Sequence, residues 1–439
     1  MHTYKEKSFL IKTLSILIAF YPVSFILGNL IINLNTLFII IIGISVFKLD
    51  IFKIDTRILR YLIPFFFFTV IFSTILNYLN NLNNITEINL YKDNVIKSFL
   101  YLRYFLLFLV VNKLTSLNLL EIKYLFYVSG ALCFFLGLDL IVQNIHGKDL
   151  FGLVSPHERK LSGFFGDEII AGGYLQNFSF FAILCFPLIF KNYNKKQFFL
   201  YLIISIMFFL GCIMISGNRV PLFLFVGSVI VLFLIEKELR KKFAIFILIF
   251  TLFAGSIYAY DSKVKNNVNN LFFWSNEILT NSYKVLNFNI NYESRSFHLR
   301  NFKYGIHVWQ QNKWLGSGLR SLRQNCKNEL RFMQKAGFIL CNNHPHNYYI
   351  EILADTGLVG FISVMVLFLF SLINFFIFYL KNSNLKIEKK IAYLAPFLIF
   401  CAQIFPIKSS GSFFSTSNAT LIFLVFALVS NANFYKKKI

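Results

Sequence analysis

The chain has 439 residues, of which 57% are hydrophobic and 57 are phenylalanine. This composition excludes a soluble globular domain, because too few polar residues remain to cover a water-exposed surface. The formal net charge of +23 would suggest a nucleic-acid partner in a soluble protein. Its distribution along the chain instead fits a membrane protein, and no nucleic acid is needed to explain it.

Apolar runs follow one another along the whole chain and predict an all-α integral membrane protein with about 12 transmembrane helices. In a helix, about 20 apolar residues cross a hydrocarbon core of roughly 30 Å. We expect the first run to be a retained span, since no small-residue cleavage site follows it. The predicted spans cover residues 9–27, 31–47, 62–79, 96–114, 124–142, 169–190, 198–215, 221–235, 243–260, 354–380, 391–407 and 416–433.

Lys and Arg are unevenly divided between the connections. Every second connection is basic, whereas the alternate short connections contain almost no Lys or Arg. By the positive-inside rule, this pattern places both termini in the cytoplasm. Residues 1–439 are then a single polytopic membrane domain with two long outer segments, 143–168 and 261–347. Long loops in a compact membrane protein are usually functional.

The first outer segment leads into the sequence GFFGDEIIAGGYLQ, which begins at Gly163. Asp167 and Glu168 lie there at the outer mouth of the sixth predicted span. A carboxylate in this position could orient a histidine or an acceptor hydroxyl, or pair with an arginine. We take Glu168 as a candidate catalytic residue. No metal site is predicted, because the chain has no D-x-D sequence and no zinc-ligand spacing.

The sequence SGNRVP forms the short outer connection between the seventh and eighth spans. Arg219 opens a helix there, and Pro221 follows two residues later. A guanidinium group beside the free N–H groups of a helix N-terminus makes an anion site suited to phosphate or pyrophosphate. The alternative is a snorkelling interfacial arginine, but an outward-facing positive charge opposes the topology rule.

The segment 294–323 combines arginines, histidines and tryptophans on the outer side. Residues 297–311 alternate near helical period and predict an amphipathic helix on the membrane face. Arg295, His298 and Arg300 are candidates for substrate binding. Outer-face arginines could hold a lipid diphosphate, or equally could bind lipid head groups.

Cys326 and Cys341 are the one cysteine pair in the large outer segment. In an oxidising compartment such a pair could close a disulfide, which would hold the residues that follow in register. Two unrelated free thiols are the alternative.

The sequence HPHNYYIEILADTGLVG starts at His344, where the long polar segment runs into a span. Asn347 is a predicted N-cap, with Glu351 and Asp355 near the positive end of the helix dipole. A neutral imidazole at this boundary can accept a proton from a sugar hydroxyl near pH 7, which is general-base catalysis. We therefore predict His346 as the base, with His344 and Asn347 as substrate-binding neighbours.

These blocks together resemble the O-antigen ligase/polymerase family of bacterial membrane glycosyltransferases. The matching pieces occur in the family's order over nearly the whole chain: GFFGDEIIAGGYL, SGNR, WLGSGLRSLRQNC, CNNHPHNYYIEILADTGLVG and SGSFFSTSNA. The resemblance implies a GT-C-like architecture in the bacterial inner (cytoplasmic) membrane. It also implies that segment 261–347 is a large periplasmic loop between spans 9 and 10, with the active site on the periplasmic face.

The resemblance further implies a metal-independent, inverting transfer without a cofactor. The donor would be a glycan linked to undecaprenyl pyrophosphate, with His346 as the base and Arg219 on the pyrophosphate. The family's R-x3-W sequence is not kept, because His298 stands at the arginine position and Phe302 at the tryptophan. Arg295 and Arg300 flank His298, and either could serve instead.

The acceptor is left open by these motifs. As a ligase, the protein would transfer the glycan to the lipid A core. As a polymerase, it would join repeat units on the lipid carrier, and a third possibility is transfer to protein. A transporter or lipid-linked glycan flippase is the alternative from another class, but the long basic link expected after span six is replaced by the short segment 191–197.

Overall fold

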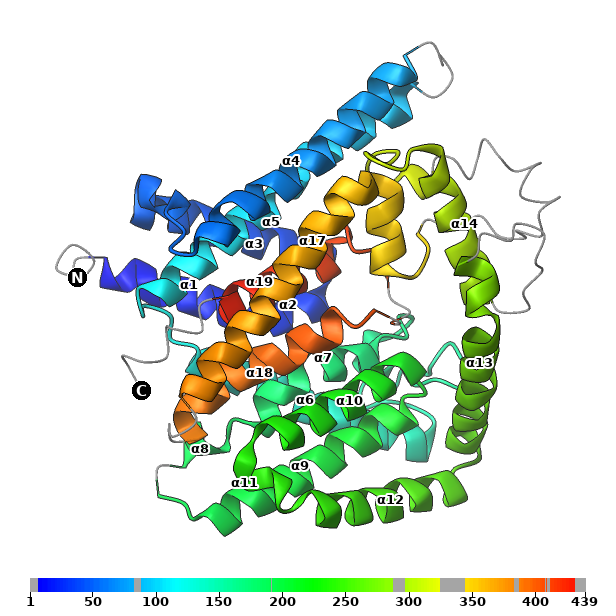
Figure 1. The fold of residues 1–439 in the computed structure, drawn as a ribbon. Helices are drawn as coiled ribbons and strands as arrows, with labels where there is room; N and C mark the ends of the chain where they lie inside the picture. The colour runs from blue at the N-terminus through cyan, green and yellow to red at the C-terminus, as the bar shows by residue number, and fades with distance from the viewer. Residues whose placement is uncertain are drawn as a thin grey trace.

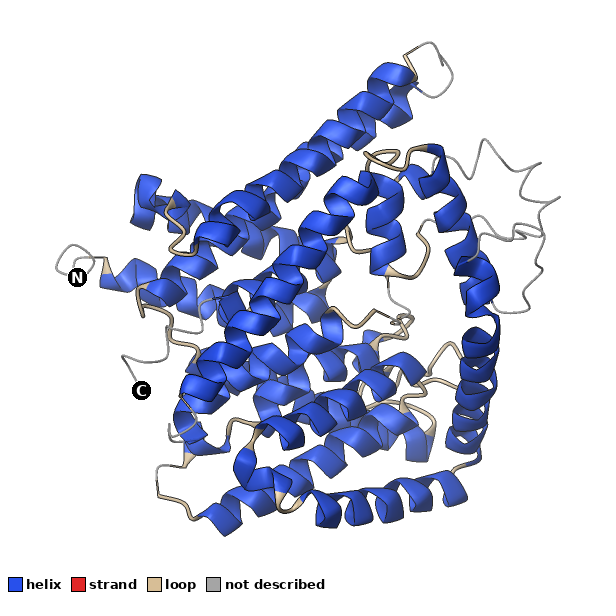
Figure 2. Cartoon of the chain, in the orientation of Figure 1, coloured by secondary structure: helices blue, strands red, loops and turns tan. Residues whose placement is uncertain are grey.

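The computed structural model describes residues 7–82, 88–190, 192–286, 297–323, 344–382, 387–406, 408 and 411–430. Within these ranges the chain is helical and has no strand (Figure 2). Seven of the described helices are long and apolar enough to cross a membrane, or eight if the bent pair α1 (Ser8–Ala19) and α2 (Tyr21–Leu27) is one span. Three more apolar helices are shorter. The all-α class of a multi-pass membrane protein is confirmed, whereas the count of twelve spans is not.

The remaining helices complete the bundle in Figure 1. They are α3 (Asn29–Phe47), η2 (Lys48–Phe52), α4 (Arg57–Asn80), α5 (Ile88–Ser116), α6 (Lys123–His146), η3 (Gly163–Phe165), α7 (Ala171–Ile183), α8 (Phe186–Ile189), α9 (Lys195–Ile215), α10 (Arg219–Ile235), α11 (Lys237–Arg240), α12 (Phe243–Tyr260), α13 (Ser262–Leu286), α14 (Phe297–Gln311), α17 (Tyr348–Lys381), α18 (Ile387–Gln403) and α19 (Thr416–Ser430).

Two of the predicted spans are broken at proline. The first divides into α1 and α2, which meet at an angle of 47°, with Pro22 in the first turn of α2. The sixth divides into α7 and α8, with Pro187 in the first turn of α8. Proline has no N–H to continue the preceding helix but fits the first turn of a new one. Continuous apolarity in the sequence therefore overestimates helix length at these two places.

The helices form two groups that are joined by α18, which packs against α19 in the first group and against α7 and α10 in the second. One group packs α4, α5, α17 and α19 together, and the other packs α6, α7, α9 and α10. In α7 nearly every side chain is buried, so this short helix belongs to the protein core. In contrast, α12 is almost entirely exposed along its apolar length, as expected for a helix that faces lipid.

The segment predicted as the large outer loop is largely helical where it is described. Its first part is α13, which continues from α12, and the predicted amphipathic helix over residues 297–311 is confirmed as α14. Figure 1 shows α13 and α14 running along one edge of the bundle, from α12 to the beginning of α17. Placement of α14 on a membrane face stays a prediction.

The connections predicted to lie outside gather at one end of the helices. A single cavity is lined by Gly28, Glu168, Asn218, Tyr348 and Lys408, which come from five different outer connections or their adjoining helix ends. This common location is what the alternating topology requires. The candidate functional residues lie at the same end.

Candidate functional site at the beginning of α10, α14 and α17

The HPHN turn leads directly into α17. The side chain of Asn347 caps this helix by accepting hydrogen bonds from the N–H groups of Tyr349, at 3.0 Å, and Ile350, at 3.2 Å. The same side chain donates to the carbonyl of Pro406 at 2.8 Å. The predicted N-cap is thus confirmed. Because both ends of the amide are used, Asn347 fixes the start of α17 against the connection between α18 and α19.

His346 adopts a left-handed backbone conformation, with φ of 57°. Such a conformation is uncommon outside glycine and is concentrated at functional sites. The turn brings the imidazole of His346 within 4.3 Å of that of His344, measured between ring centroids. The ring of His298 lies 5.8 Å from His346. Three histidines from two segments therefore meet at one place.

The two neighbouring imidazoles are neutral at pH 7. Burial, with the charge of His346 as a second cause, lowers the pKa of His344 to about 4. For His298, burial again dominates, followed by His346 and then Arg219, and its pKa is also lowered to about 4. The contribution of Arg219 to this shift indicates that the N-terminus of α10 lies in the neighbourhood of His298.

A close contact between α14 and α17 brings His298 to this position. A Cβ atom added at Gly305 would lie 2.4 Å from a methyl carbon of Ile350 and 3.2 Å from Cβ of Pro345. The absence of a side chain at Gly305 lets α14 pack directly on the first turn of α17. His298 is two helical turns before Gly305, on the same side of α14.

Arg219 is the first residue of α10, and the turn before it is held by surrounding backbone. Gly217, with φ of 72°, leaves no room for a side chain, since an added Cβ would lie 2.4 Å from the carbonyl oxygen of Arg159. Leu161 donates its N–H to the carbonyl of Ser216 at 3.1 Å. Asn218 makes no side-chain cap for α10, so the first N–H groups of this helix stay available to a ligand.

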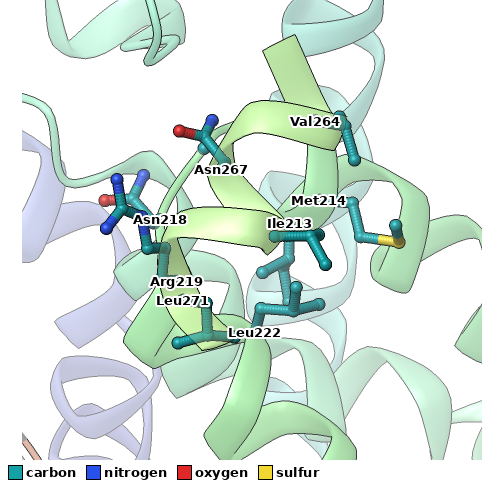
Figure 3. A pocket seen from close by; sticks show the side chains of 10 residues that line it. Ile213, Met214, Asn218, Arg219, Leu222, Val264, Asn267 and Leu271 are labelled. Atoms are coloured by element: carbon teal, nitrogen blue, oxygen red, sulfur yellow. The ribbon is translucent and has the colours of Figure 1, made fainter. Parts of the chain in front are cut away.

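A small pocket lies beneath this turn, where α9, α10 and α13 meet (Figure 3). The polar ends of Asn218 and Arg219 lie at one side of it, and Met214 and Val264 line the other. Its volume of about 10 Å³ is no larger than one water molecule requires. It is therefore too small to hold a substrate.

Two basic residues that the sequence interpretation missed stand beside Arg219. Burial, followed by the charges of Arg219 and Arg159, lowers the pKa of Lys160. The carbonyl of Arg159 accepts a hydrogen bond from the side chain of Asn267 on α13 at 3.1 Å, which fixes the segment here. The sequence HERK at residues 157–160 was a detectable signal, since it places positive charge in an outer segment.

The sequence WLGSGLRS docks into a break in α17. At Gly357 the backbone has φ of 64° and ψ of −166°. Around this break, Ser317 and Gly318 donate to the carbonyls of Ala354, at 2.8 Å, and Asp355, at 2.9 Å. The carboxylate of Asp355 accepts from the N–H of Arg320 at 2.9 Å and from the hydroxyl of Ser321 at 2.6 Å. The two glycines of GSG therefore have a structural role.

Glu351, one turn before Asp355, is also committed to structure. Its carboxylate accepts hydrogen bonds from the hydroxyl of Ser412 at 2.6 Å and the N–H of Phe413 at 2.5 Å. These bonds satisfy a buried carboxylate. They also attach the sequence SGSFFSTSNA, before and within α19, to the first turn of α17.

The predicted site residues are distributed as follows. The structure brings together His298, His344, His346 and Arg219, with Asn347 behind them. Glu168 is exposed and lines the nearby cavity. Arg300 follows His298 by two residues on α14, so it points to a different side of the helix. Arg295, Cys326 and Cys341 lie outside the described residues.

Residues 202–365 match the family model described as O-Antigen ligase. The matched segment runs from α9 through Arg219, α13, α14 and the HPHN turn to the break in α17. This match supports the O-antigen ligase/polymerase family for this part of the chain. The members of this family are membrane enzymes of the glycosyltransferase type, and their substrates are lipid-linked glycans. A comparison with curated proteins gave no match.

Proposed function

We propose that the protein is a glycosyltransferase that moves a glycan from undecaprenyl pyrophosphate to an acceptor hydroxyl on the lipid A core, at the periplasmic face of the bacterial inner membrane. The observation that supports this most is that His346 packs against His298, whose pKa also responds to the charge of Arg219. A proton acceptor and a phosphate-binding cation come together there from two helices whose residues are 127 positions apart in the sequence.

In this proposal His346 acts as the general base. It accepts the proton of the acceptor hydroxyl while the hydroxyl oxygen attacks the anomeric carbon of the donor sugar. Because His298 and His344 are uncharged at pH 7, the positive charge near His346 comes from Arg219 and the other basic residues. A positioned base of this kind contributes about 10²–10⁴-fold to the rate.

Arg219 stabilises the leaving group. The bond between the anomeric carbon and the pyrophosphate oxygen breaks, and its electron pair stays on the pyrophosphate. The guanidinium, the free N–H groups of α10 and the nearby Arg159 and Lys160 are placed to bind this charge. Preorganised cations and dipoles of this type are usually the largest contribution to catalysis.

The other predicted residues have supporting roles in the proposal. Glu168 orients the acceptor hydroxyl from the cavity wall, and His344 contacts substrate beside His346. His298 occupies the place of the family's loop arginine, with Arg300 and Arg295 as further contacts for the donor phosphates. Asn347 contributes by holding His346 in its left-handed conformation, and a Cys326–Cys341 disulfide would tether the chain before it.

The proposal is tested with purified protein in lipid nanodiscs, supplied with undecaprenyl-pyrophosphate-linked glycan and an acceptor. We expect His346→Ala to lower kcat by about 10²–10⁴-fold and Arg219→Ala by on the order of 10²-fold or more. The matched control is His146→Ala, since His146 is exposed at the end of α6. Full transfer by the His346→Ala protein at normal expression contradicts the assignment.

The same assay separates transfer from transport, because only a transferase releases free carrier from the donor. Deletion of the gene separates the two branches of the family. Loss of a ligase leaves long lipid-linked chains that are not coupled to lipid A core. Accumulation of single repeats on the carrier would instead identify a polymerase.

A further inference from the structure

A cavity of about 390 Å³ lies beside the histidine site, and Glu168 is the one residue of its lining with a role in the chemistry described above. Its walls come from α2, α3, α7, α10, the start of α17 and the connection between α18 and α19. Asn218 and Tyr348, which line it, directly neighbour Arg219 and the HPHN turn in sequence. The cavity therefore opens on the place where donor and acceptor would react.

A lysine and two amides form a polar chain on one wall. The ammonium of Lys408 donates to Oε1 of Gln403 at 2.7 Å, and Nε2 of Gln403 donates to Oδ1 of Asn177 at 2.5 Å. No carboxylate of the described residues lies within ion-pair distance of Lys408. Burial lowers the pKa of this amine to about 7. A lysine held at a cavity wall without a countercharge is costly to the fold, which favours a ligand-related reason for its presence.

A second amide of α7 also lines the cavity. Gln176 lies on α7, is only 3% exposed and lines the cavity. Its Nε2 is buried and has no hydrogen-bond partner in the described part of the chain. A buried donor that is left unsatisfied costs free energy of about 1–3 kcal/mol. A ligand that accepts a hydrogen bond would remove this cost.

The remaining lining is suited to a sugar ring. The ring of Tyr348 faces the cavity with its centroid 4.9 Å from the Lys408 ammonium, and Phe25, Ile32 and Leu224 add apolar surface. A pyranose has apolar C–H faces and a rim of hydroxyl groups. An aromatic wall with amides, an amine and the carboxylate of Glu168 around it matches both features, and the volume is in the range of small-molecule sites.

We propose that this cavity is a saccharide subsite, in which Lys408, Gln403, Asn177 and Gln176 bind the hydroxyl groups of one sugar unit of the reacting glycans. This inference rests on the proposed function for the identity of its ligand. The sugar can come from two sources, the glycan of the donor or the outer sugar of the acceptor.

Equilibrium binding to the full-length protein in nanodiscs tests the subsite without turnover. One probe is the donor saccharide released from its carrier by mild acid, and the other is the core oligosaccharide released from lipopolysaccharide. We expect Gln176→Leu to raise Kd about 3–10-fold for one of them without lowering the melting temperature, because the lost donor has no partner in the protein. Lys408→Met should raise Kd about 10–100-fold, with Lys263→Gln on exposed α13 as the matched control.

A weaker affinity for the donor saccharide alone assigns the cavity to the donor, and a weaker affinity for the core oligosaccharide alone assigns it to the acceptor. Unchanged Kd values in both variants, or no binding of either probe by the wild type, overturn the subsite. Binding that responds to the variants in a protein that transfers no glycan would refute the proposed function and leave the subsite standing. Normal transfer with an unchanged KM in both variants would do the opposite.

Discussion

Substitution of Gly357 by alanine should detach the WLGSGLRS segment from α17. With φ of 64° and ψ of −166°, Gly357 occupies a backbone region that is essentially reserved for glycine. A Cβ atom there would lie 2.3 Å from both the carbonyl carbon and the oxygen of Trp314. Both atoms belong to the backbone, so the conflict cannot be relieved by a side-chain rotation.

The cost of this substitution follows from the contacts around the break. The strained conformation alone costs an alanine about 1–3 kcal/mol. Four backbone hydrogen bonds join residues 313–318 to α17 around the break. They run from Ser317 to Ala354 at 2.8 Å, from Gly318 to Asp355 at 2.9 Å, from Leu358 to Lys313 at 2.9 Å and from Val359 to Trp314 at 3.1 Å. At a net value of about 0.5–1.5 kcal/mol each, loss of half of them adds about 1–3 kcal/mol. We therefore expect Gly357→Ala to cost at least about 2 kcal/mol.

The assay is thermal unfolding of the protein in nanodiscs, followed by the transfer assay at a temperature where the variant is folded. We expect both the melting temperature and the transfer rate to fall, because His346 lies at the start of the displaced helix. Gly227→Ala is the control, since Gly227 lies within α10 with no atom within 4 Å of an added Cβ, and alanine favours a helix. A Gly357→Ala protein as stable as the Gly227→Ala protein refutes this reasoning.

Two further predictions concern the histidine site. The pKa values of His298 and His344, about 4, lie below the ordinary 6.5. The unfolded chain therefore binds more protons between these values, and stability should fall as the pH drops from 7 to 4, by about 1 kcal/mol for each histidine at pH 5.5 after solvent screening. Melting temperatures at pH 7.5 and 5.5 measure this loss of stability. The loss should be smaller in the double variant with His298→Asn and His344→Asn. Separately, Gly305→Val should lower kcat far more than Gly305→Ala, because its extra methyl groups separate α14 from Ile350 and Pro345.

Each of these two predictions has an outcome that would contradict it. An equally large loss of melting temperature in the double histidine variant would show that the acid sensitivity arises from other groups. A Gly305→Val protein with the kcat of the wild type would show that the spacing of α14 and α17 does not control the site.

The sequence predicted helices correctly where the deciding interactions are between residues close together in the chain. Residues 297–311 form α14 as their periodicity indicated, and Asn347 caps α17 as its position before an acidic turn indicated. The errors arose from tertiary structure. Residues 169–190 read as one apolar span, but Pro187 divides it and most of its first half is buried in the protein. The helix α13 was missed because its many polar residues were interpreted as a loop, although its apolar residues recur at helical spacing.

The site was predictable in its chemistry but not in its supporting contacts. The signal at Arg219 was a positive charge in an outer connection, and the same signal was present at Lys408, in the connection before the last helix. It was not used there, because nothing in the local sequence indicates that Gln403, Asn177 and Gln176 share a wall with Lys408. Asn177 and Gln176 lie on α7 and Gln403 lies on α18, so the Gln403–Asn177 hydrogen bond joins residues that are 226 positions apart in the sequence.

The two buried carboxylates of α17 attach its first two turns to two other parts of the chain. Glu351 accepts hydrogen bonds from the chain that leads into α19, and Asp355 accepts hydrogen bonds from the chain that follows α14. A shift of these two turns would therefore move both partners. His346 and the segment that carries Lys408 are therefore both attached to the start of α17, and we expect a sugar bound on one side of the cavity to shift the other side as well.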